Sequence, residues 1–167
     1  MRFADFLKAT VLLSAGGATL LAVITILGAA REAGESTLTY VGVGWWVAAA
    51  LLGAWLGRRN EASPPIARLL AEARMQTTLP ELRPGLTLLN RLWPLLFSTL
   101  GAAILGLFVP QVAAIAAGFA IIWALAWRRQ DAAVTAIEDR DGFRFYVDRT
   151  PPVEPIRLIR TPGLKGG

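Results

Sequence analysis

Cysteine and histidine are both absent from this chain. Without them, disulfides, thiolate chemistry, histidine-ligated haem and the usual zinc sites are excluded together. Any catalysis would have to use carboxylates, hydroxyls, lysine or arginine. The sequence also contains no phosphate-binding glycine loop and no nucleophile elbow. We therefore expect no cofactor, no metal and no catalytic residue, and whether the protein is an enzyme stays open.

Charge is missing from three long stretches, at residues 9–30, 36–57 and 92–127. The first two are 22 residues long and the third is 36. One helix across a hydrocarbon core of about 30 Å needs about 20 residues, so the third stretch is long enough to cross and return. The apolar share of 54% agrees with this reading. The sequence predicts an all-α integral membrane protein, a four-span helical bundle.

Two alternatives stay open beside these four spans. Residues 1–30 have the basic start, apolar core and small residues of a cleaved signal peptide, although the apolar run exceeds the usual 7 to 15 residues. Residues 92–127 are slightly short for two full helices and a turn, so this segment could dip into the bilayer and return. Pro110, at its midpoint, suits either hairpin.

Positive residues outside the spans are unevenly distributed. Arg2 and Lys8 precede the first span and Arg31 alone follows it, whereas six arginines lie at residues 58–91. The positive-inside rule then places both termini in the cytoplasm of a plasma or inner membrane. The expected organisation is an N-terminal transmembrane hairpin (1–57), a cytoplasmic connection (58–91), a second hairpin (92–127) and a cytoplasmic tail (128–167).

Small residues recur at four-residue spacing in the second span, at Ala49, Gly53 and Gly57. This spacing places them on one helix face, where backbones can approach closely. The row either closes the protein's own bundle or docks a partner helix or a second copy.

The cytoplasmic connection contains a short amphipathic pattern. Ser63 and two prolines form a helix start, with a hydroxyl able to cap the first amides. Apolar Ile66, Leu69 and Leu70 share one face, while Arg68 lies on another and Arg74 follows. Such a helix either lies on the bilayer surface or docks a membrane or cytosolic partner.

The tail shows a turn signal at residues 139–142, followed by the alternating strand pattern of residues 143–147. Phe143, Phe145 and Tyr146 are its candidate partner or lipid contacts. Residues 134–137 could pair with this strand as a β-hairpin or continue the last span as a helix, and residues 156–160 alternate again. Because so small a sheet is marginal alone, we expect it to pack on the 58–91 connection, on a second copy or on a partner.

The acidic run at residues 138–141 suggests metal chemistry only superficially. It lacks the downstream aspartates in the signature of membrane CDP-alcohol phosphotransferases and the terminal glutamate of a calcium loop. We expect a solvated turn.

Three function classes remain. No span carries an ionisable residue, which argues against a proton-coupled pump, and the nearly neutral tail argues against a nucleic-acid partner.

The leading hypothesis is a non-enzymatic accessory, assembly or scaffold subunit that binds its partner through cytoplasmic segments. The alternatives are a passive channel, holin-like pore or small-solute carrier, and a lipid-headgroup enzyme. That enzyme would hold phosphate with arginines such as Arg74, Arg83 and Arg91, and its acid and base would be Glu72, Glu81 or an aspartate of the tail.

Overall fold

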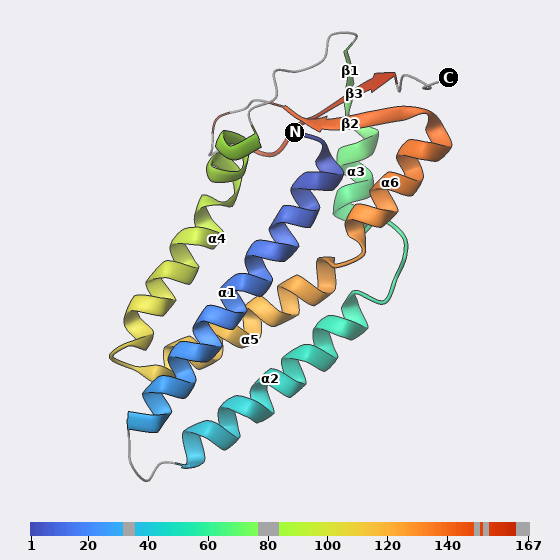
Figure 1. Ribbon diagram of the computed structural model, residues 1–167. Coiled ribbons are helices and arrows are strands. Elements are labelled where there is room, and N and C mark those ends of the chain that lie inside the picture. The colour runs from blue at the N-terminus through green and yellow to red at the C-terminus, as the bar shows by residue number, and fades with distance from the viewer. Residues whose placement is uncertain (32–35, 77–83, 149–150, 152–153, 163–167) are drawn as a thin grey trace. The chain divides into compact units, whose positions relative to one another are not determined.

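The computed structural model describes residues 1–31, 36–76, 84–148, 151 and 154–162 (Figure 1). The described chain is mostly helical. Its helices are α1 (Phe3–Arg31), α2 (Ser36–Leu56), α3 (Pro64–Ala71), α4 (Pro84–Gly106), α5 (Pro110–Trp127) and α6 (Gln130–Asp141). Its strands are β1 (Arg74–Met75), β2 (Phe143–Val147) and β3 (Leu158–Pro162).

Four helical stretches are long and apolar enough to cross a membrane: Phe3–Arg31, Thr39–Leu56, Pro84–Gly106 and Pro110–Asp141. They confirm the expected number of candidate spans and are compatible with a multi-pass membrane protein. The description all-α is incomplete, because a small three-stranded sheet accompanies the helices. Helix α4 begins at Pro84, well before the uncharged stretch at residue 92, since proline suits the first turn of a helix.

The chain divides into two compact units that interleave along the sequence. Unit 1 comprises Met1–Ala9, Arg59–Trp93 and Arg129–Gly167, and unit 2 comprises Thr10–Arg58 and Pro94–Arg128. Each is described by itself.

Unit 2 contains the apolar helices, of which α2 and α5 pack along each other. At the middle of α2, Trp45 and Trp46 donate their indole N–H groups to the carbonyls of Ile115 and Ala114, over 3.2 and 2.9 Å. Helices α1, α4 and α5 meet in a small buried cluster of Leu21, Ala103, Ala113 and Ala117. The three alanines allow the backbones to come close, as is typical of helix packing in membranes.

Unit 1 is organised around its sheet, whose strand order is β1-β3-β2. The central strand β3 runs antiparallel to β2 and parallel to β1, with Arg74 opposite Ile159. The N-terminus adds to the outer edge of β2, where Arg2 bridges Tyr146 and the Val147 N–H donates to the carbonyl of Met1. The tail therefore packs on the 58–91 connection, one of the three supports expected for it.

The tail starts as a helix and not as the first strand of a hairpin. Residues 134–137 belong to α6, which ends at Gly142 in a left-handed conformation with φ of 71°. Glycine adopts this conformation readily, and the Gly142 N–H closes the helix by donating to the carbonyl of Glu138. The expected strand at 143–147 is present as β2, whereas β3 lies two residues further along the chain than the 156–160 pattern indicated.

Candidate functional site

The exposed residues of unit 1 that sequence reasoning identified lie on α3 and β1. Arg68 and Arg74 are exposed and Leu69 is half-buried. Glu72, at the C-terminal cap of α3, is exposed as well. Met75 on β1, which sequence reasoning did not identify, keeps 60% of its surface exposed. We call these five residues the α3–β1 surface. It combines two guanidinium groups, a carboxylate and a flexible apolar side chain within eight residues of chain.

The other candidate contacts contribute to the inside of unit 1. Ile66, Leu70 and Phe145 are 1%, 7% and 5% exposed, so these side chains are not available to lipid or to a partner. Phe143 is half-buried beneath the Arg160 guanidinium, 5.6 Å from its ring centre, and Tyr146 is half-buried in the sheet. The amphipathic face of α3 thus supplies the core of its own unit.

A charged centre at Glu138 joins the N-terminus to the tail. The Glu138 side chain is fully buried and accepts bonds at Oε2 from Arg2 Nη2 (2.6 Å) and Arg144 Nη1 (3.1 Å). Its Oε1 accepts the backbone N–H of Phe145 over 2.9 Å. The hydrogen bond to Glu138 raises the pKa of Arg144 above its ordinary value, and a second bond to Asp139 adds to the effect. A carboxylate with three donors is a structural anchor, because its lone pairs are already engaged.

The expectation of a solvated turn at residues 138–141 is therefore wrong for Glu138. Helix α6 continues through this run and turns Glu138 inward, while Asp139 stays exposed. The sequence offered no sign of this role, since Arg2 lies 136 residues away.

The starts of α3 and α6 are tied together by a second buried polar group, Gln130. Its Oε1 accepts the backbone N–H of Ser63 over 2.8 Å, and its Nε2 donates to the carbonyl of Glu61 over 3.3 Å. Ser63 holds the expected N-cap position, but its hydroxyl makes no capping bond. A side chain from α6 thus satisfies the amide at the start of α3.

The residues considered for lipid-headgroup chemistry take part in different structural elements and contacts. Arg91 donates from Nη1 to the carbonyl of Glu154, over 2.5 Å, and Arg74 lies in β1. Arg83 and Glu81 fall outside the described residues. Among the residues that the structure does describe, no group of three or more acidic side chains is placed to hold a metal ion.

The small-residue row of α2 faces α5 of the same chain. Ala49 is fully buried. A Cβ at Gly53 would lie 2.9 Å from Leu125 Cβ, and a Cβ at Gly57 would meet the Leu125 carbonyl. This face of α2 is occupied within the protein itself.

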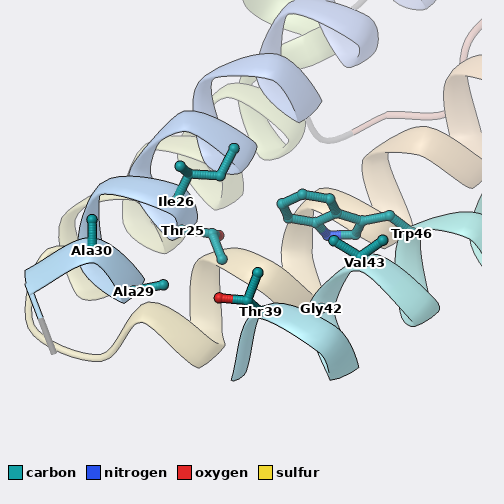
Figure 2. A pocket seen from close by; sticks show the side chains of 8 residues that line it. All are labelled: Thr25, Ile26, Ala29, Ala30, Thr39, Gly42, Val43 and Trp46. Atoms are coloured by element: carbon teal, nitrogen blue, oxygen red, sulfur yellow. The ribbon is translucent and has the colours of Figure 1, made fainter. Parts of the chain in front are cut away.

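Unit 2 also contains an apolar cavity of about 450 Å³ between α1 and α2 (Figure 2). The Thr25 hydroxyl donates to the carbonyl of Leu21, and the Trp46 indole N–H is engaged by Ala114. The cavity thus offers mainly hydrocarbon surface. Its lining residues are Thr25, Ile26, Ala29, Ala30, Thr39, Gly42, Val43 and Trp46.

No family model matches this chain, and the chain matches neither a curated protein nor a solved structure.

Proposed function

We propose that this chain is a multi-pass membrane protein that serves as a non-enzymatic accessory, assembly or scaffold subunit and binds its partner through unit 1. One observation carries the proposal: three segments far apart in the sequence fold into one polar unit attached to apolar helices. The buried ionisable group of that unit, Glu138, is engaged in holding the segments together. A unit built in this way is suited to present a surface and not to perform acid–base chemistry.

The α3–β1 surface is the part of unit 1 that we expect the partner to contact. Arg68 and Arg74 are exposed, and arginine and methionine are both enriched at protein interfaces. Met75 supplies an adaptable apolar contact beside these charges. We expect the partner to be a membrane or cytosolic protein with an acidic patch, because this surface carries two guanidinium groups and only one carboxylate.

Crosslinking in intact membranes, followed by detergent extraction and mass spectrometry, tests this proposal. The wild-type chain should recover a reproducible partner that the double charge reversal Arg68→Glu with Arg74→Glu no longer recovers. Both side chains are exposed, so the reversal should leave the folding of unit 1 intact.

The control reverses Arg140 and Arg157, two other exposed arginines of unit 1, which pair with Asp141 and Glu154. It changes the net charge equally and should keep the partner. If both double variants lose the partner equally, binding depends on the overall positive charge of the chain. That result would count against the α3–β1 surface. Recovery of this chain alone, together with conductance in proteoliposomes, would favour a passive pore instead.

A further inference from the structure

The cavity between α1 and α2 combines a large volume with an apolar lining. Its volume of about 450 Å³ falls within the range of roughly 300–1,000 Å³ that is usual for small-molecule sites. An engineered apolar cavity of only about 150 Å³ is enough to bind benzene. The residues described as lining the cavity include no ionisable side chain. The cavity is therefore suited to a neutral hydrocarbon.

Water finds few partners in this cavity. The Thr25 hydroxyl donates to the Leu21 carbonyl over 2.8 Å, and the Trp46 indole N–H donates to the Ala114 carbonyl over 2.9 Å. A buried water makes about three hydrogen bonds, and apolar cavities without such partners stay dry. An empty cavity deprives its lining of dispersion contacts. A hydrocarbon would supply these contacts without breaking a hydrogen bond.

The cavity extends along its two helices. On α2 its lining runs from Thr39 to Trp46, which at the helical rise spans roughly 10 Å. The Trp46 ring reaches from α2 toward Thr25 and Ile26 of α1 (Figure 2). Half of a hydrocarbon core of about 30 Å is about 15 Å, so the cavity covers about two-thirds of one leaflet. An elongated ligand that lies along the helices fits this shape.

The cavity is open to the surroundings of the helices. Two of its lining side chains, Ile26 and Val43, are 58% and 50% exposed. They belong to Phe3–Arg31 and Thr39–Leu56, which are apolar enough to cross a membrane. In a bilayer, side chains at such positions border the lipid acyl chains, so an acyl chain can enter the cavity from the side.

We propose that the cavity between α1 and α2 binds one acyl chain of a membrane lipid. The chain lies along the two helices against the Trp46 ring, and the headgroup stays outside the cavity. Because the recognised part is hydrocarbon, the length of the chain decides binding and the charge of the headgroup does not. The proposal shares with the proposed function the membrane placement of the helices, but it does not involve unit 1 or its partner.

Native mass spectrometry of the full chain in detergent tests the dependence on chain length. The probes are phosphatidylcholine and phosphatidylglycerol with long acyl chains, and dihexanoyl phosphatidylcholine as the short-chain analogue. We expect the wild-type chain to retain one long-chain lipid with either headgroup and to lose the short-chain analogue. Preference for phosphatidylglycerol, or equal retention of the short-chain lipid, would overturn the proposal. A wild-type chain that carries no lipid, as a monomer or as a dimer, would also overturn it.

Filling the cavity tests its place in the structure. Ala29 extends from α1 toward Thr39 (Figure 2), so Ala29→Phe would put a phenyl ring where the acyl chain lies. The variant should bind long-chain phosphatidylcholine about tenfold more weakly, because losing the burial of about two methylene groups suffices for this change. The matched control is Ala15→Phe, the same exchange at an exposed position of α1 outside the lining, and it should keep the wild-type affinity. Equal weakening in both variants would overturn the proposal.

Photo-crosslinking of the wild-type chain tests the site without any substitution. Phosphatidylcholine with a diazirine on one acyl chain is irradiated with the full chain, and the labelled residues are mapped by mass spectrometry. The label should concentrate at residues 25–30 and 39–46. If it is equally frequent at Phe97 and Leu100 of α4, which are 72% and 59% exposed, the lipid contact is that of any exposed helix face and the proposal fails.

Discussion

Glu138 is the residue on which unit 1 most depends, because one buried carboxylate holds arginines from both ends of the chain. We predict that Glu138→Ala destabilises unit 1 by about 3 kcal/mol, the lower end of the range for breaking a buried ion pair, since both arginines keep some exposure. Faster limited proteolysis of the tail in the purified full chain would measure this.

Two variants make the test specific. Asp139→Asn removes another partner of Arg144, but Asp139 is 60% exposed, so the cost should stay below about 1 kcal/mol. Glu138→Gln keeps an oxygen for the Phe145 N–H and should fall between the two. If the protease cleaves the tail of the Glu138→Ala variant and that of the Asp139→Asn variant at the same rate, Glu138 is not the anchor.

Residue roles were predictable from the sequence where the cause is local. Gly142 closes the turn signal at residues 139–142, which is a local combination of aspartates and a glycine, and the strand that follows has the expected bounds. Glu138 could not be recognised in this way. Its burial depends on Arg2, and nothing near residue 138 indicates that contact.

The packing of α2 on α5 leads to a prediction about elements. Gly57→Ala would place a methyl group against the Leu125 carbonyl. Because this carbonyl belongs to the backbone of α5, it cannot move away as a flexible side chain could. We expect the variant to lose about 1–3 kcal/mol, the usual cost of overpacking, and to unfold at lower temperature in detergent.

Gly44→Ala is the control, because Gly44 lies within α2, which ends one residue before Gly57, and its new methyl group would meet nothing within 4 Å. Alanine is the better helix former, so Gly44→Ala should be neutral or stabilising by up to about 1 kcal/mol. Equal destabilisation by the two changes would mean that the close approach at Gly57 does not matter.

The sequence predicted the type of the main helices and strands better than their bounds. The uncharged stretches indicated four helices because a helix needs only its own residues to satisfy its backbone. The sheet was harder to place. Strand β3 pairs with a two-residue strand in the 58–91 connection, and so short a strand carries no pattern of its own.

At the scale of the whole molecule, the sequence suggested four consecutive regions, whereas the contacts group the chain into two interleaved units. Composition can group only residues that are consecutive in the sequence. The pairing of Arg74 with Ile159 and the bridge between Arg2 and Tyr146 instead join residues that are far apart in the sequence. Unit 1 therefore depends on all three of its segments. The positive-inside rule independently leads us to expect both termini and the 58–91 connection on one side of the membrane.

The absence of cysteine allows a clean test of that topology, because each introduced thiol is the only one in the chain. Gln111→Cys marks the exposed start of α5 and Arg157→Cys marks the exposed tail. The positive-inside rule predicts that a membrane-impermeant maleimide labels Gln111→Cys in intact cells and labels Arg157→Cys only after permeabilisation. The reverse pattern would invert the topology. Failure of Gln111→Cys to label in intact cells, with unchanged behaviour of Arg157→Cys, would favour a segment 92–127 that dips into the bilayer and returns.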